Sequence, residues 1–153
     1  MAITGFHHVC FTVTDIEKTV SFWRDVLGLT LRSRSRNGYL GLGTELMGRK
    51  WGMDHPYADI DLAVLEFNGQ KVEFIQYLDP RTEPFHKNPS IAGNAHLAFR
   101  VTDIEGMKRD LESKGVEFHA DIAIFRETGK PEWKWVYFRD PDGICVELVE
   151  AED

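Results

Sequence analysis

The chain contains one ten-residue phrase twice, and this repeat constrains its fold more than any other feature. His8–Glu17 reads His-Val-Cys-Phe-Thr-Val-Thr-Asp-Ile-Glu, and His96–Glu105 reads His-Leu-Ala-Phe-Arg-Val-Thr-Asp-Ile-Glu. Seven of the ten positions are identical, and the second copy begins 88 residues after the first. The repeat predicts a tandem duplication of one unit. A structural repeat would need only the apolar pattern, yet a histidine opens both copies.

Each copy predicts a strand followed by a helix. Residues 6–13 alternate in polarity and are rich in aromatic and β-branched side chains, which is typical of a half-buried strand. Thr14, with Glu17 three places on, forms a capping box for a helix that runs to about Leu27 and stops at Gly28. The second copy repeats these signals in the same order: the strand 97–101, the capping pair Thr102 and Glu105, and the closing Gly115.

About three further strands follow each helix. The Asn68-Gly69 pair predicts a tight hairpin between two of them. The expected strands are 29–35, 39–42, 60–67 and 71–78 in the first half, and 116–120, 133–138 and 145–150 in the second. Either half alone would bury too little surface to be stable, so the 153 residues predict one domain. Its expected parts are module 1 at about 4–79, a linker at about 80–93 and module 2 at about 94–150.

Composition excludes several classes of partner. The net charge of −7 argues against nucleic acid and anionic membranes, because the field of the protein would repel phosphates. No apolar run approaches the length of a membrane span, and the first residues do not resemble a signal peptide. Two cysteines, Cys10 and Cys145, are too few for a disulfide scaffold. These features predict a cytoplasmic protein.

Two histidines and two glutamates occupy matched positions in the two modules. His8 and His96 open the repeated strands, while Glu73 and Glu147 lie in the last strand of each module, in Lys-Val-Glu-Phe and Cys-Val-Glu-Leu. Side chains alternate across a strand, so each of these residues can be assigned to one face. If the two sheets face a common cleft, the four side chains converge on one divalent cation. A mixed nitrogen and oxygen set suits zinc, nickel, cobalt, manganese or iron.

Each of these residues alone has a more ordinary interpretation. A histidine in a strand is usually a hydrogen-bonded core residue, and a buried glutamate often pairs with a cation such as Arg100 or Lys71. Four such residues repeated in register favour an ion, because a buried charge without a partner is costly. His7 is the rival of His8, but strand alternation predicts that His7 faces the helix.

These motifs resemble the vicinal oxygen chelate superfamily, also called the glyoxalase, bleomycin-resistance and dioxygenase group. The most specific phrases are the opening His-Val, Phe-Trp-Arg-Asp-Val-Leu-Gly-Leu, and Phe-Arg-Asp-Pro-Asp-Gly before Val-Glu-Leu. The resemblance spans nearly the whole chain. It implies an α+β fold of two tandem βαβββ modules that form a metal-lined cup, a small-molecule substrate and a homodimer. The family's ligand positions match His8, Glu73, His96 and Glu147.

The ligand set ranks the reactions that the resemblance implies. Four protein ligands resemble glyoxalase I and methylmalonyl-CoA epimerase, which implies a lyase, isomerase or epimerase that moves a proton beside a metal-bound carbonyl. Glu147 or Glu73 would then be the base. Extradiol dioxygenases keep two histidines and one glutamate, and Tyr137 resembles the tyrosine of their signature. The third alternative is a protein that sequesters a small molecule, as antibiotic-resistance members do.

Two further features leave alternatives open. Residues 43–58 form a loop with several large apolar side chains, which either covers the site as a lid or packs on the surface without a function. Arg32, Arg34 and Arg36 alternate along an expected edge strand. They either hold the phosphates of a thioester carrier or form a solvated face that discourages aggregation.

Overall fold

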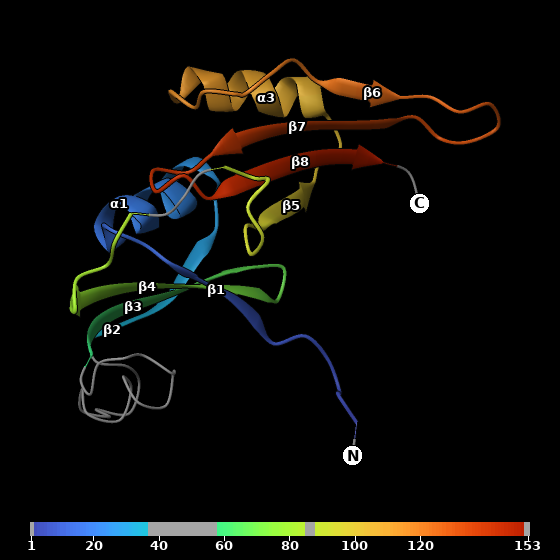
Figure 1. Ribbon diagram of the computed structural model, residues 1–153. Coiled ribbons are helices and arrows are strands. Elements are labelled where there is room, and N and C mark those ends of the chain that lie inside the picture. Colours follow the sequence, from blue (N-terminus) through green and yellow to red (C-terminus); the bar gives the residue numbers. More distant parts are fainter. Residues whose placement is uncertain (1, 37–57, 85–87, 152–153) are drawn as a thin grey trace. The chain divides into compact units, whose positions relative to one another are not determined.

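The computed structural model describes residues 2–36, 58–84 and 88–151. The chain divides into two compact units, Met1–Pro84 and Phe85–Asp153. Each unit contains a four-stranded sheet and has the order strand, helix, three strands (Figure 1). The predicted α+β fold of two tandem βαβββ modules is therefore confirmed. No helix among the described residues is both long and apolar enough to cross a membrane.

In unit 1 the sheet order is β1-β4-β3-β2, with β1 parallel to β4 and the other pairs antiparallel. Asn68 and Gly69, between β3 and β4, both have positive φ values, of 48° and 79°. This is the conformation that a two-residue hairpin turn requires. The elements are β1 (His8–Thr12), α1 (Ile16–Ser21), the π-helix η1 (Phe22–Val26), β2 (Thr30–Arg36), β3 (Asp59–Phe67) and β4 (Gln70–Asp79).

Unit 2 repeats this topology with the sheet order β5-β8-β7-β6, in which β5 is parallel to β8. Its elements are β5 (His96–Arg100), α3 (Ile104–Ser113), β6 (Ala123–Phe125), β7 (Trp133–Arg139) and β8 (Cys145–Ala151). The predicted strand at 116–120 is wrong. That segment forms only an isolated bridge, between Phe118 and Phe138, and β6 pairs with β7 as the edge strand instead.

Both helices begin one residue later than the capping boxes predict. Asp15 is the N-cap of α1 and accepts a hydrogen bond from Lys18 N at 3.1 Å. Asp103 is the N-cap of α3 and accepts from Gly106 N at 2.8 Å. The predicted Thr14 and Thr102 caps are therefore wrong. An aspartate at the cap satisfies a free amide of the first turn as a threonine would, and it adds a negative charge at the positive end of the helix dipole.

The first helix also ends differently from the prediction. After Ser21 the chain continues as a π-turn, in which Leu27 N donates to Phe22 O at 3.2 Å. Trp23 in this turn is fully buried, and its ring centroid lies 5.0 Å from that of Phe74 on β4. The prediction of a regular α-helix to Leu27, made from the apolar spacing, is therefore wrong for the last turn. The hydrogen bonds there span one residue more than those of an α-helix.

The two middle strands of unit 1 are apolar on both faces. One face packs on the helix through residues such as Phe74. The opposite face carries Glu73, because Val64 lies directly across from Glu73 and both point to that side. A buried apolar cluster continues along it, formed by Ala58, Ile60, Leu62, Val64 and Ile75 with Tyr77 packed against them. Glu73 thus lies on an otherwise largely apolar surface.

The three arginines of β2 are paired with carboxylates. Arg32 contacts Glu66 at 2.6 Å, Arg36 contacts Asp59 at 2.8 Å, and Arg34 contacts both Asp61 at 2.9 Å and Glu17 at 2.7 Å. The guanidinium of Arg32 lowers the pKa of Glu66. These pairs favour the solvated-face interpretation over a phosphate site. The predicted strand 39–42 and residues 43–57 of the predicted lid lie outside the described residues.

Candidate functional site

Each unit brings one histidine beside one glutamate on adjacent parallel strands. His8 Nε2 lies 3.5 Å from Glu73 Oε2, and His96 Nε2 lies 3.0 Å from Glu147 Oε2. The register is the same in both units, since the residue two places after each histidine lies opposite the glutamate. The structure therefore brings the four predicted residues together as two equivalent pairs.

Both carboxylates are largely buried. The side chains of Glu73 and Glu147 are 16% and 12% exposed. Within the described ranges neither forms an ion pair with a lysine or arginine, so the expected partners Lys71 and Arg100 do not neutralise them. A buried carboxylate needs a compensating charge or hydrogen bonds, and a histidine provides a charge only when it is protonated. This environment suits a bound cation.

The separations within the pairs fit two ligands of one ion. Two ligand atoms that are each about 2.1 Å from a metal ion at a tetrahedral angle lie about 3.4 Å apart. The observed 3.5 Å and 3.0 Å are close to this value. The described residues contain no group of three or more candidate metal ligands, so each unit alone supplies two donors. A four-ligand site formed from both pairs stays a prediction.

His8 is oriented by its neighbour His7. The Nδ1 atoms of the two rings are 2.7 Å apart, and His7 is exposed. The prediction that His7 packs against the helix is wrong, because His7 precedes the first residue of β1. A hydrogen bond at one ring nitrogen fixes the tautomer and presents the other nitrogen, as is common around metal ligands. Here it directs Nε2 of His8 to Glu73.

Tyr137 contacts both members of the pair in unit 2. It lies directly across from Glu147 on β7, and its ring meets that of His96 edge-on, with centroids 5.6 Å apart. Burial and a hydrogen bond to Glu147 raise the pKa of Tyr137 to about 12. The hydroxyl therefore stays protonated at neutral pH and donates to the carboxylate. The equivalent position in unit 1 is Val64, so Glu73 has no such donor across from it.

Two side chains that sequence reasoning missed hold the glutamate strands against the helices. Gln76 Oε1 accepts from Ile16 N at 3.0 Å, and Glu150 Oε2 accepts from Ile104 N at 2.7 Å. Each lies three residues after the glutamate of its unit, and each caps the first helical residue. The recurrence of a long polar side chain at this spacing in both modules is a signal that could have identified them.

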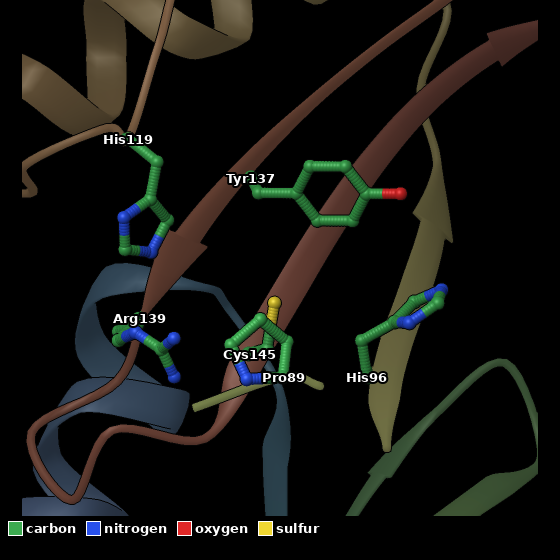
Figure 2. A pocket seen from close by; sticks show the side chains of 6 residues that line it. All are labelled: Pro89, His96, His119, Tyr137, Arg139 and Cys145. Carbon is green, nitrogen blue, oxygen red and sulfur yellow. The ribbon is translucent and has the colours of Figure 1, made fainter. Parts of the chain in front are cut away.

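In unit 2, the face of the sheet that carries His96 and Tyr137 also contains a pocket of about 390 Å³. Figure 2 shows His96 and Tyr137 on one side of it and two cationic or ionisable side chains, His119 and Arg139, on the other. Arg139 Nη1 donates to Gly143 O at 2.6 Å. Sequence reasoning missed both His119 and Arg139. The lining residues are Pro89, His96, His119, Tyr137, Arg139 and Cys145.

The two cysteines lie close to the donor pairs. Cys10 is opposite Glu73, and Cys145 is opposite His96. Desolvation and the charge of Glu73 raise the pKa of the Cys10 thiol to about 11, and desolvation raises that of Cys145. Both thiols are therefore protonated at neutral pH.

Comparisons with known proteins find relatives over nearly the whole chain. The family model described as the Glyoxalase/Bleomycin resistance protein/Dioxygenase superfamily matches residues 5–148. The uncharacterized protein YaeR of Escherichia coli K12 is 32% identical, with 98% of each chain covered. The glutathione transferase FosA of Serratia marcescens is 31% identical, covering 95% of this chain and 80% of the relative. A 2-epi-5-epi-valiolone epimerase from an Actinomyces species is 28% identical, covering 94% and 77%.

Among solved structures, a glyoxalase family protein from Bacillus cereus has the same fold. The TM-score is 0.80 at 22% identity, over 100% of this chain and 97% of that chain.

Proposed function

Because the chain belongs to the glyoxalase, bleomycin resistance protein and dioxygenase superfamily, we propose that it is a metal-dependent enzyme that moves a proton beside a metal-bound carbonyl of a small substrate. Its class would be an isomerase, epimerase or lyase. The similarity to a valiolone epimerase supports proton transfer, while the similarity to FosA shows that relatives also include a transferase.

The observation that carries the proposal is the doubled histidine and glutamate pair. His8, Glu73, His96 and Glu147 would hold one divalent ion, as each unit supplies an imidazole nitrogen and a carboxylate oxygen at ligand spacing. When bound, the ion would polarise a substrate carbonyl and make the adjacent C–H more acidic. Zinc, nickel, cobalt, manganese and iron all suit this donor set.

Glu73 is the better candidate for the base. Glu147 accepts a hydrogen bond from the Tyr137 hydroxyl and lies 3.0 Å from His96, so two contacts hold its carboxylate in place. Glu73 is 3.5 Å from His8 and faces the aliphatic Val64. A carboxylate with fewer hydrogen bonds moves more easily to a substrate proton, and a water-poor surface beside it shields the reacting carbon.

Metal content tests the ligand assignment. The purified protein should bind one divalent ion per site, and His96→Ala should lose stoichiometric binding while its circular dichroism stays close to that of the wild type. His119→Ala, in the same unit but outside the ligand set, is the matched control and should keep its metal. Full metal occupancy in His96→Ala would overturn the assignment.

Solvent isotope exchange tests the reaction. The metal-loaded protein, in deuterium oxide with small α-hydroxy ketones and 2-substituted malonyl thioesters as probes, should introduce deuterium at the carbon next to the carbonyl, as measured by proton NMR. Glu73→Gln should lower the rate of deuterium exchange by a larger factor than it lowers the metal content. Metal and ligand binding without exchange for any probe would favour the sequestering alternative.

Ring-cleaving dioxygenation is the second candidate, and Tyr137 is the observation that favours it. Its hydroxyl beside Glu147 and its ring against His96 would suit a residue that orients a phenolate. This candidate predicts oxygen uptake with catechol by the ferrous protein. Oxygen uptake with catechol, together with no deuterium exchange, would replace the proton-transfer proposal.

A further inference from the structure

We propose that Arg139 and His119 form a subsite that binds an oxyanion of the substrate, a carboxylate, phosphate or phosphonate group, at the end of the unit 2 pocket away from the His96–Glu147 pair. The inference deepens the proposed function and rests on it in one respect: the His96–Glu147 pair is taken as the end of the pocket that binds the metal.

Strand register places these side chains on the site face. Arg139 lies opposite Cys145, which lies opposite His96, so the three residues form one row across β7, β8 and β5. His119 N donates to Tyr137 O at 3.0 Å, next to the Phe118–Phe138 bridge. His119 is therefore beside Tyr137 in the neighbouring row. Adjacent strands are about 4.8 Å apart, so Arg139 starts about 10 Å from His96.

Groups of opposite charge lie beside the two ends of the pocket. Glu147 does not line the pocket, but its carboxylate lies 3.0 Å from His96, which does, and the Tyr137 hydroxyl donates a hydrogen bond to this carboxylate. The guanidinium of Arg139 lies on the other side of the pocket, near His119 (Figure 2). A ligand with a neutral oxygen donor at one end and a negative charge at the other would match both ends.

Arg139 has the chemistry and the support to bind an oxyanion. A guanidinium has five N–H donors in a planar fork that matches carboxylate and phosphate oxygens. The bond from Nη1 to Gly143 O, 2.6 Å, anchors the group to the turn between β7 and β8. An anchored donor loses less freedom on binding than a mobile one. His119 supplies a further ring nitrogen on the same side of the pocket.

The pocket has the size of a small-molecule site. About 390 Å³ is near the lower end of the range for small-molecule sites. A compact organic acid or phosphorylated metabolite fits this volume.

Anion binding to the metal-free protein tests the subsite without any catalytic readout. Inorganic phosphate, and acetate against its neutral analogue acetamide, are titrated into the full chain while NMR follows the Arg139 and His119 side-chain signals. Phosphate and acetate should give saturable shifts at both residues and acetamide should give none. Tighter binding of phosphate would indicate a subsite for phosphate or phosphonate groups, and tighter binding of acetate would indicate a subsite for carboxylates.

Matched variants assign the binding to these residues. Arg139→Gln should weaken binding of the preferred anion at least about tenfold, because hydrogen bonds to charged groups are worth that factor or more. Arg126→Gln, an exposed arginine paired with Glu132, should bind the anion within about twofold of the wild type. Since Arg139 also anchors a turn, His119→Asn provides a second variant, with an expected weakening of about threefold.

The outcomes separate the subsite from the proposed function. Anion binding that is unchanged in His119→Asn and in folded Arg139→Gln, or the absence of saturable shifts in the wild type, overturns the subsite. Arg139→Gln should still bind metal as the wild type does. If the protein binds anions at Arg139 but binds no metal, the subsite stands and the proposed function falls. If it binds metal but no anion at Arg139, the proposed function stands and the subsite falls.

Discussion

Glu73 and Glu147 occupy equivalent positions in their units, yet single neighbouring residues give them different chemistry. Tyr137 lies across from Glu147 and donates to it, while Val64 lies across from Glu73. His7 supports His8 through Nδ1, whereas the ring of His96 meets Tyr137. The two copies of the unit therefore carry equivalent carboxylates, of which Glu147 is held in place and Glu73 is freer to move.

The raised pKa of Tyr137 predicts a pH dependence of stability. Folding raises this pKa from 10.0 to about 12, so between these values the unfolded chain loses the phenolic proton and the folded chain keeps it. Stability must then fall as pH rises through this window. Urea unfolding of Tyr137→Phe should show a shallower decline between pH 10 and 12 than the wild type.

Tyr77→Phe serves as the control for this measurement, since Tyr77 lies in unit 1 and its pKa is raised mainly by desolvation. It should leave the part of the decline that is due to Tyr137 unchanged. Identical slopes for the wild type and Tyr137→Phe would contradict the raised pKa of Tyr137.

At the scale of the elements, each helix is joined to the strand that carries its unit's glutamate. Gln76 on β4 caps α1 at Ile16 N, and Glu150 on β8 caps α3 at Ile104 N. Asp15 and Asp103 cap the amide two residues further on, Lys18 N in α1 and Gly106 N in α3. The start of each helix thus helps to hold the strand that presents the candidate ligand, and the same arrangement occurs in both units.

The two caps of α3 can be distinguished by adjacent substitutions. Asp103→Ala removes the acceptor for Gly106 N and should lower the free energy of unfolding by about 1 kcal/mol. Thr102→Ala, one residue earlier, should change it by less than about 0.5 kcal/mol, because the exposed threonine is not the cap. Chemical unfolding followed by tryptophan fluorescence measures both. A larger loss in Thr102→Ala would restore the cap that the sequence predicts.

For the whole molecule, the proposed four-ligand site would take half of its ligands from each unit. The His8–Glu73 pair belongs to unit 1 and the His96–Glu147 pair to unit 2. A shared ion would make the two halves interdependent. His8→Ala and His96→Ala should then each abolish metal binding, whereas independent sites would leave about half of the metal in each variant.

Mixing these two variants tests whether the halves come from one chain or two. If the site forms across a symmetric dimer, dimers of His8→Ala with His96→Ala chains contain one intact site and one doubly altered site. Random mixing should then restore about a quarter of the metal sites. If both halves come from one chain, mixing restores none. Metal analysis after subunit exchange, with unmixed variants as controls, separates the two results.

The sequence alone determined the duplication, the order of elements in each unit and the faces of the four candidate ligands. These features are local or periodic, so His8 and Glu73 could be assigned to strand faces from alternation, and Asn68-Gly69 to a hairpin from the φ values it tolerates.

Only the tertiary structure decided which strands pair and what gathers beside each pair. The parallel pairing of β1 with β4 and of β5 with β8 brings each histidine to its glutamate, because the strand register sets which distant residues are neighbours. The isolated bridge at Phe118 brings His119 beside Tyr137, and the turn after β7 anchors Arg139. No periodic pattern carries such contacts, since they depend on where separate segments pack.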